Sequence, residues 1–132
     1  MPMVSLLIVA HSAQLAEGVR EFASHAVRGT VHILAAGGAI DGSLGTNVDQ
    51  IRGKLQEAMS PDGTLVLVDF NSAVMSVEAA LEGLQGIVVE ISDAPLVEGT
   101  FLAAVEASVG ASLAETAAAA LRARSLVKVR HD

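Results

Sequence analysis

Short apolar runs alternate with segments of helical periodicity along almost the whole of this 132-residue sequence. The apolar runs cover residues 4–9, 31–35, 64–68 and 87–91. Such alternation is typical of α/β domains, in which parallel strands are joined by right-handed helical crossovers. We therefore predict a single α/β domain over residues 1–132. It is expected to be a three-layer sandwich, a four-stranded parallel sheet with helices on both faces.

Five helices are predicted from the spacing of apolar residues and from residues suited to cap a helix. Ser12 fits the N-cap of the first helix, Thr46 with Asp49 three residues later suggests a capping box for the second, and Ser112 opens the last. The apolar residues 126–129 can form an additional C-terminal strand. The expected helices cover residues 13–27, 47–59, 72–84, 97–109 and 112–124.

The composition limits both the core and the chemistry. Hydrophobic residues make up 52% of the chain and aromatic residues 2%, so the core has to be built from Ala, Val, Leu and Ile. Cysteine is absent, which excludes disulfides, thiolate metal ligands and cysteine nucleophiles. No apolar run approaches the roughly 20 residues of a membrane span, and the N-terminus lacks the basic start of a signal peptide. We expect a soluble cytoplasmic protein.

The formal net charge of −7 is unevenly distributed. Residues 122–132 carry a net +3 from four basic side chains against the carboxylate of Asp132, so the rest of the chain carries −10. An acidic surface repels nucleic acid, whose binding depends on basic contacts with phosphates. Any bound phosphate would therefore need local hydrogen-bond donors. The basic segment itself is interpreted as a solvated helix end and terminal strand.

Four loops that follow the predicted strands are expected to converge at one edge of the sheet. They are His11-Ser12, the glycine-rich residues 37–46, residues 69–72 and residues 93–96. In a parallel sheet the carboxyl ends of the strands share one edge, and each of these loops also delivers a helix N-terminus. The backbone N–H groups of helix N-termini attract anions. The sequence therefore predicts an anion site at this edge.

His11 is the candidate nucleophile of this site, because a neutral imidazole can accept a phosphoryl group near pH 7. Asp69 is the candidate carboxylate that fixes the tautomer of His11 and stabilises the charge that builds on its ring. The candidate phosphate-binding residues are the hydroxyls of Ser12, Thr46 and Ser72 and the glycines Gly38 and Gly45, which let the backbone approach a ligand closely.

Structural roles remain open for each of these residues. A histidine at a strand end can be a structural hydrogen-bonding group, and Asp69 can simply cap the helix that follows it. His25 and His32 lack a loop setting and His131 lies on the terminal tail, so all three are interpreted as structural or solvated. No metal ligand set and no cofactor site is predicted.

Taken together, four segments resemble one family in order and spacing. They are residues 9–19 around Ala10-His11-Ser12, the loop 37–46 with its Gly45-Thr46 end, Asp69-x-x-Ser72-Ala73, and residues 93–99 with the sequence DAPLVEG. The family is the phosphotransferase subunit of phosphoenolpyruvate-dependent dihydroxyacetone kinase, whose domain is similar to mannose-type enzyme IIA. The likeness runs from about residue 4 to residue 110. Asn71 and Asn47 depart from the glycine and serine usual at those positions.

The resemblance implies a phosphotransferase that works through a phosphohistidine. The residue corresponding to His11 would accept a phosphoryl group from a separate histidine-containing phosphocarrier protein. It would pass that group to ADP bound on the nucleotide-binding subunit of dihydroxyacetone kinase. The resemblance further implies a homodimer with no cofactor.

Other functions fit parts of the same pattern. A sugar-specific mannose-type enzyme IIA would differ only in passing its phosphoryl group to a IIB component. A small tetrapyrrole metal chelatase can also begin with a strand ending in Ala-His, although the later strand ends here supply Asp69 and Asp93 and no further histidine. A phosphoaspartate receiver domain would need an acidic pair after the first strand, which is absent. A regulatory dimer that only binds an anion is the non-catalytic alternative.

Overall fold

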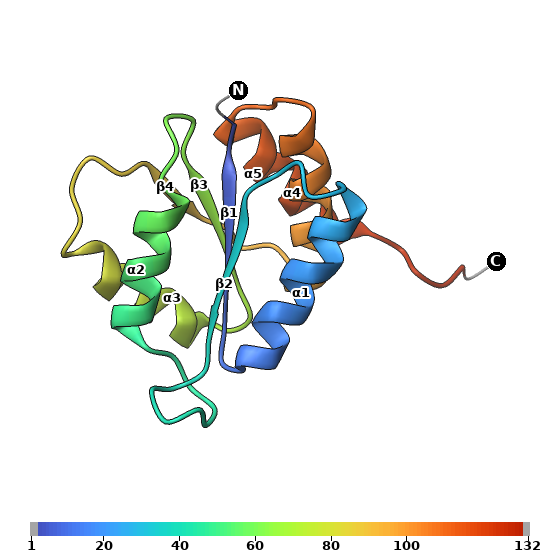
Figure 1. The fold of residues 1–132 in the computed structure, drawn as a ribbon. Coiled ribbons are helices and arrows are strands. Elements are labelled where there is room, and N and C mark those ends of the chain that lie inside the picture. The colour runs from blue at the N-terminus through green and yellow to red at the C-terminus, as the bar shows by residue number, and fades with distance from the viewer. Residues whose placement is uncertain (1–2, 131–132) are drawn as a thin grey trace.

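A computed structural model of the protein describes residues 3–130 and shows a four-stranded parallel sheet in the order β2-β1-β3-β4 (Figure 1). This confirms the predicted α/β architecture. Strands β1 and β3 pair at the centre of the sheet, and β2 and β4 form its edges. The strands are β1 (Ser5–Ala10), β2 (Ile33–Gly37), β3 (Thr64–Val68) and β4 (Val89–Ile91), and the helices are α1 (Ala13–Ala26), α2 (Val48–Ala58), α3 (Asn71–Leu81), α4 (Leu96–Ser108), α5 (Leu113–Leu121) and the 3₁₀ helix η1 (Arg122–Ser125).

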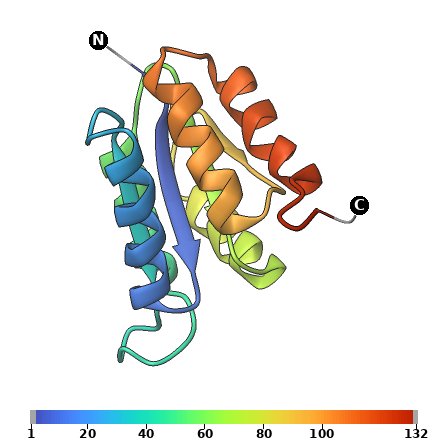
Figure 2. The ribbon, with the colours of Figure 1, turned by 90° about the vertical axis from the view of Figure 1, so that its right-hand side faces the viewer.

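Helices cover both faces of the sheet, as the repeated crossovers predict. Helices α1, α4 and α5 lie on one face and α2 and α3 on the other (Figures 1 and 2). Alternate residues of β1 serve the two faces: Leu6 and Ile8 join the cluster under α1 and α4, while Leu7 and Val9 join the cluster under α2 and α3. This double burial is why the run reads as continuously apolar rather than alternating.

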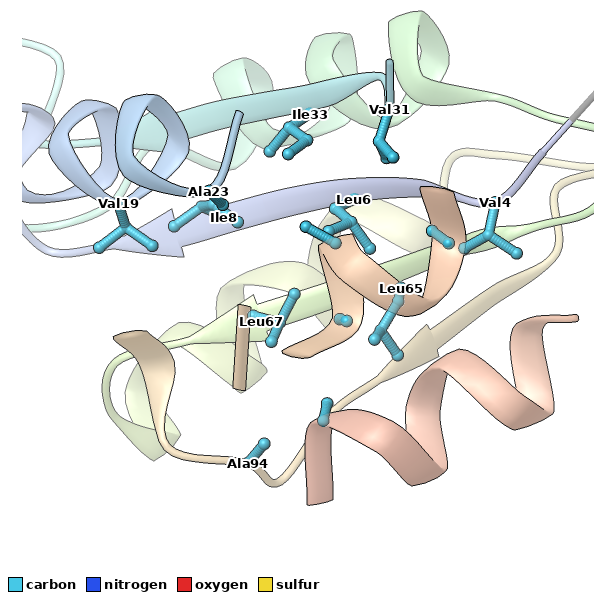
Figure 3. Packing of buried hydrophobic residues seen from close by; sticks show 14 of the residues in the cluster. Val4, Leu6, Ile8, Val19, Ala23, Val31, Ile33, Leu65, Leu67 and Ala94 are labelled. Atoms are coloured by element: carbon cyan, nitrogen blue, oxygen red, sulfur yellow. The ribbon is translucent and has the colours of Figure 1, made fainter. Parts of the chain in front are cut away.

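The larger of the two cores combines bulky strand residues with small helix residues. Leu6, Ile8, Leu65 and Leu67 project from β1 and β3 toward the helices in Figure 3. The helices pack against these strand residues mainly through alanine. Helices α4 and α5 contribute five fully or nearly buried alanines to this cluster, namely Ala103, Ala104, Ala107, Ala117 and Ala120. Small side chains let helices approach a sheet closely, which explains how a chain without Trp or Tyr fills its core.

Several predicted boundaries were wrong in detail. Helix α2 is capped by Asn47, whose side-chain oxygen accepts from the backbone N–H groups of Asp49 and Gln50, and not by Thr46. Asparagine is the better N-cap, and the hydroxyl of Thr46 has another partner in the structure. Helix α3 ends at Leu81 rather than at residue 84, followed by a turn in which the N–H of Leu84 donates to the carbonyl of Leu81.

The expected C-terminal strand is absent from the described residues. Residues 126–130 have no strand partner, and Leu126, Val127 and Val129 are exposed. Lys128 forms an ion pair with Glu98 of α4, which holds this segment against a helix instead of the sheet edge. A strand needs a neighbouring backbone to pair with, and periodicity alone does not supply one.

The carboxyl ends of β1 and β3 form the point at which the chain direction across the sheet reverses. From β1 the chain moves to β2 on one side, and it then returns to β3 and β4 on the other. In open α/β sheets the crevice at such a switch point is the usual ligand site. His11 and Asp69 directly follow these two strands. Among residues 3–130, no helix combines the length and the apolar character that crossing a membrane requires.

Candidate functional site

His11 and Asp69 contact each other at this switch point. Nδ1 of His11 lies 3.0 Å and 3.2 Å from the two carboxylate oxygens of Asp69, and the backbone N–H of His11 donates to Oδ2 at 2.8 Å. Oδ1 also accepts from the N–H of Phe70. The Asp69 side chain is only 8% exposed, whereas that of His11 is 28% exposed. A well-anchored carboxylate therefore holds a ring that solvent can still reach.

These contacts determine which nitrogen of His11 is available for chemistry. A carboxylate only accepts hydrogen bonds, so Nδ1 has to carry the proton when the ring is neutral. Nε2 then holds the lone pair, and the hydroxyl of Ser72 donates to it at 2.8 Å. The prediction that Asp69 lies beside the ring agrees with this geometry. The alternative, in which Asp69 only caps α3, does not, because its carboxylate accepts from the N–H of the N-cap residue Phe70 and also bonds the backbone and the ring of His11.

The start of α3 adds further donors to this position. Its N-cap residue is Phe70, and the helix begins without any side-chain acceptor for its first backbone N–H groups. Such groups suit an anion because they carry the positive end of the helix dipole. Ser72 lies in this first turn, so its hydroxyl and the helix N-terminus approach His11 from the same direction.

The glycine-rich loop is attached directly to the His11 segment. The N–H of Gly45 donates to the carbonyl of His11 at 2.8 Å, and Gly45 has a φ of +142°, which side chains rarely allow. Gly38 lies against Ala13 at the start of α1. Gly37, which the sequence analysis did not select, approaches even more closely. A Cβ there would lie 2.5 Å from the carbonyl oxygen of Ser12.

The hydroxyls of Ser12 and Thr46 have structural partners. Ser12 caps α1 by accepting from the N–H of Leu15 at 3.1 Å. Thr46 lies 2.6 Å from the hydroxyl of Ser76 on α3. Ser76 was missed by the sequence analysis, although it stands four residues after Ser72 and therefore on the same helix face. It links the end of the glycine-rich loop to the helix that carries Ser72.

The surroundings of His11 combine an aromatic ring with acidic groups. The Phe70 ring makes an edge-on contact with the imidazole, with ring centroids 5.9 Å apart. A groove beside Asp69 is lined by Phe70, Val74, Asp93 and Arg124, among others. Arg124 is paired with Asp93, so this cation is already neutralised at the edge of the groove.

The remaining histidines and possible metal ligands lie elsewhere. His25 and His32 are exposed on the surface, and His131 falls outside the described residues. Within residues 3–130 there is no cluster of three His, Asp or Glu side chains that could bind a metal ion. At His11 the structure brings together an imidazole held by a carboxylate, a hydroxyl within hydrogen-bond distance of its other nitrogen and the uncapped start of a helix.

Comparison with known proteins identifies the family to which the chain belongs. Residues 5–117 match the family model EIIA-man, described as PTS system fructose IIA component. The chain belongs to this family. The match covers the sheet, His11 and all the loops of the candidate site.

Similar proteins of assigned function support this family assignment. The chain is 41% identical over 113 residues to the phosphoryl donor subunit DhaM of PEP-dependent dihydroxyacetone kinase 2 from Listeria innocua, covering 83% of this chain and 90% of that protein. It is 37% identical over 117 residues to the corresponding DhaM subunit from Escherichia coli, covering 84% of this chain but only 25% of that protein. The resemblance to this subunit is thereby confirmed, and the chain is a phosphotransferase-system component of the EIIA-man family.

A solved structure supports the same fold. The phosphotransferase system component EIIA from Streptococcus agalactiae superposes with a TM-score of 0.69, covering 96% of this chain and 97% of that one. The two sequences are 13% identical, so this structural similarity supports the fold and not a shared function.

Proposed function

We propose that the protein is the phosphoryl donor subunit of a phosphoenolpyruvate-dependent dihydroxyacetone kinase, with His11 as the residue that carries the phosphoryl group. One observation carries this proposal. The His11 ring is held through Nδ1 by Asp69, which leaves the Nε2 lone pair at a partly exposed position among anion-binding donors. The named relatives with 37–41% identity supply the reaction context.

In the first step Nε2 of His11 attacks the phosphorus of a phosphohistidine on the donor, which we take to be the histidine-containing phosphocarrier protein. An Nε2–P bond forms, the N–P bond of the donor breaks, and the donor imidazole leaves with that electron pair. The proton on Nδ1 stays in its hydrogen bond to Asp69, whose negative charge offsets the positive charge that builds on the ring. No general base is needed, because Nε2 attacks as a free lone pair.

In the second step the same bond is broken in favour of a nucleotide. An oxygen of the terminal phosphate of ADP, bound on the nucleotide-binding subunit of the kinase, attacks the phosphorus and forms ATP. The Nε2–P bond breaks and its electron pair returns to the ring. Asp69 again holds Nδ1, so the imidazole is released in the tautomer from which the next cycle starts.

The negative charge of the phosphoryl group would be met by short-range donors of this chain. Ser72 is already at hydrogen-bond distance from Nε2, and rotation of its hydroxyl would turn it from the nitrogen to a phosphoryl oxygen. The uncapped start of α3 contributes backbone N–H groups from the same side. Thr46, Ser12, Gly38 and Gly45 are the further candidate contacts. Transfer of a phosphoryl group requires mainly such positioning and charge stabilisation.

The proposal extends to assembly and location. We propose a cytoplasmic homodimer that receives its phosphoryl group from a separate carrier protein. Sedimentation analysis of the purified protein tests the dimer, since a monomer at working concentrations would contradict it.

The decisive test starts with enzyme I, the phosphocarrier protein and phosphoenolpyruvate. After incubation, mass spectrometry should find one added phosphoryl group on His11, stable in base and labile in acid. Addition of the nucleotide-binding kinase subunit with ADP should then remove the label and produce ATP. Drainage of the label by a sugar-specific IIB component instead would favour the enzyme IIA alternative. A protein that takes up no label would be limited to anion binding.

A further inference from the structure

The chain has three phenylalanines and neither Trp nor Tyr, and its phenylalanines occupy two different settings. Phe22 of α1 and Phe101 of α4 pair with each other, with ring centroids 5.8 Å apart. Phe70 instead contacts the imidazole of His11, with centroids 5.9 Å apart and the two ring planes inclined by 65°. A chain that contains so few aromatic residues therefore places one of them against the candidate nucleophile.

Neither the core nor the start of a helix accounts for a phenylalanine at position 70. The side chain belongs to neither core cluster, and the residue is 68% exposed. It stands at the N-cap of α3, where Ser, Thr, Asp and Asn are preferred, and it makes no capping hydrogen bond through its side chain. Exposure alone means little, since single apolar residues are common on protein surfaces. The contact with His11 is what distinguishes Phe70.

The segment 69–72 holds the His11 ring at three points. Asp69 accepts from Nδ1, and the hydroxyl of Ser72 lies 2.8 Å from Nε2. Phe70, between them in the chain, contacts the ring itself. The two hydrogen bonds fix the positions of the nitrogens, whereas the aromatic contact opposes rotation of the ring about its χ2 torsion, whose energy minima are broad in histidine.

A phosphoryl group on Nε2 would remove one of these three contacts. The new bond uses the lone pair of the nitrogen, so Ser72 can no longer donate to Nε2 and turns to a phosphoryl oxygen, as proposed above. The ring itself is then held by Asp69 at Nδ1 and by Phe70. A hydrogen bond at one nitrogen acts as a pivot, which leaves the aromatic contact to restrict the swing of the ring.

We infer that Phe70 is a positioning residue for phosphoryl transfer, whose ring holds the imidazole of His11 in the orientation that directs the Nε2–P bond toward the hydrogen-bond donors at the start of α3. The inference rests on the proposed function, in which His11 carries the phosphoryl group. These donors, the Ser72 hydroxyl and the first backbone N–H groups of α3, belong to the same chain as His11. The alignment therefore matters whether or not a partner protein is bound. Phe70 takes no part in the bonds that form and break.

A docking role is the competing explanation, because exposed aromatic residues are frequent at the centres of protein interfaces. The two roles differ in their kinetics. A docking residue changes the partner concentration that gives half the limiting rate, and it does not affect a reaction with a small donor. A positioning residue changes the limiting rate with every donor, because it acts on the geometry of the reacting group.

The test uses Phe70→Ser, Phe70→Leu and Phe70→Tyr, with Phe22→Ser as the matched control that removes a 54% exposed ring from the other aromatic pair. Each protein is phosphorylated by phosphoramidate, a small phosphoryl donor that needs no docking, and mass spectrometry follows the label on His11. Single-turnover transfer from the carrier protein and to the nucleotide-binding kinase subunit with ADP is then measured over a range of partner concentrations. Circular dichroism shows whether each variant retains the fold.

We expect Phe70→Ser to lower the phosphoramidate rate, and the limiting rates with both partner proteins, by about two- to tenfold, which corresponds to the loss of one aromatic pair contact. The half-saturating partner concentrations should stay unchanged. Phe70→Leu keeps an apolar side chain without the aromatic ring and should also be slowed. Phe70→Tyr keeps the ring and should restore nearly the wild-type rate, and Phe22→Ser should behave as wild type.

The positioning inference and the proposed function fail in different ways. Labelling of Phe70→Ser and Phe70→Leu by phosphoramidate at the wild-type rate overturns the positioning inference and leaves the proposed function intact. Raised half-saturating concentrations with unchanged limiting rates also overturn the inference, since Phe70 would then serve docking. Wild-type protein that takes up no label on His11 from the carrier protein overturns both proposals.

Discussion

The same two strands carry a polar pair at each end, and the two pairs behave differently. At the amino end, Ser5 and Thr64 are register partners in β1 and β3, and their hydroxyls lie 2.8 Å apart. Both residues are almost completely buried, and both hydroxyls also contact the carbonyl of Ala58 at the end of α2. At the carboxyl end, His11 and Asp69 follow the same strands, and the histidine keeps an exposed side.

The two pairs differ in how many of their polar atoms have hydrogen-bond partners within the protein. The hydroxyls of Ser5 and Thr64 find partners entirely within the protein, so the pair can only contribute to stability. The ring of His11 is held on one side by a buried carboxylate and meets only a rotatable hydroxyl on the other. Burial and complete pairing indicate a structural role, whereas one-sided pairing leaves a group free to react. Variants at the two ends of the strand pair test this contrast.

Replacement of His11 by Ala should abolish phosphoryl uptake while the fold persists. The position follows β1 in a partly exposed loop, and the side chain adds little to the core. Uptake is measured as label from phosphorylated carrier protein, and thermal unfolding checks the fold. The exposed His25→Ala is the matched control and should retain full uptake. Label that persists in His11→Ala would assign the reaction to another residue.

Replacement of Asp69 by Asn should slow phosphoryl transfer by about 10- to 100-fold, the range found when a carboxylate that orients a metal-bound histidine is removed. The amide can no longer fix the proton on Nδ1 or offset the charge of the ring. The rate is measured in single-turnover transfer, with the exposed Asp62→Asn as control. Transfer at the wild-type rate would show that the tautomer argument is wrong.

Replacement of Thr64 by Val should reverse this pattern, with lower stability and unchanged transfer. The valine removes a buried hydroxyl from the Ser5 pair, and the expected loss is about 1–2 kcal/mol of unfolding free energy. Urea unfolding measures it. Thr30→Val, at an exposed position where the hydroxyl donates to the carbonyl of Val27, should cost less. A slower transfer in Thr64→Val would mean that the two ends of the strand pair are coupled.

Replacement of Ser76 by Ala should slow transfer by about two- to tenfold, the equivalent of one hydrogen bond. The hydroxyl of Ser76 lies 2.6 Å from that of Thr46 and holds it at the end of the glycine-rich loop, so its loss lets the Thr46 hydroxyl move away from a phosphoryl group on His11. Ser108→Ala removes a comparable helix hydroxyl far along the chain from the site and should have no effect. Equal rates for both variants would reduce the Thr46–Ser76 contact to a structural one.

The smallest effect concerns pH and the loop beside His11. Hydrogen bonds from Ser43 lower the pKa of the Asp41 carboxyl from its ordinary value of 3.8. A lowered pKa in the folded state stabilises the loop fully above the ordinary pKa and loses this contribution as the pH falls through the lowered value. Carboxyl NMR titration should therefore give a higher midpoint in Ser43→Ala. The Ser5–Thr64 pair contains no titratable group and should not respond over this range.

Much of the fold could be predicted because its signals are local. The run from Leu6 to Ala10 is buried on both faces and therefore apolar throughout, and the capping box of Ser112 and Glu115 is present as expected. The prediction of a C-terminal strand was wrong because residues 126–129 have strand-forming side chains but no neighbouring strand to pair with among the described residues. Pairing depends on a distant segment, which no local pattern reveals.

In the candidate site, too, some contacts could be predicted from the sequence and others could not. That His11, Asp69 and Ser72 would meet followed from their positions after parallel strands, since such ends share an edge. The link of Thr46 to Ser76 did not follow, because it depends on how the loop folds back onto α3. The close approach of Gly37 to Ser12 was missed for the same reason.

The order of strands and helices, the residue types of the core and the edge at which polar residues gather therefore all followed from the amino-acid sequence. These properties arise from periodicity and from the geometry that all parallel sheets share. The assembled fold was needed to show which nitrogen of His11 is held, which hydroxyl lies beside the other nitrogen, and that the glycine-rich loop is bonded to the carbonyl of His11. Such choices depend on distances of about 3 Å between residues some sixty positions apart in the chain, and packing sets these distances once the elements are assembled.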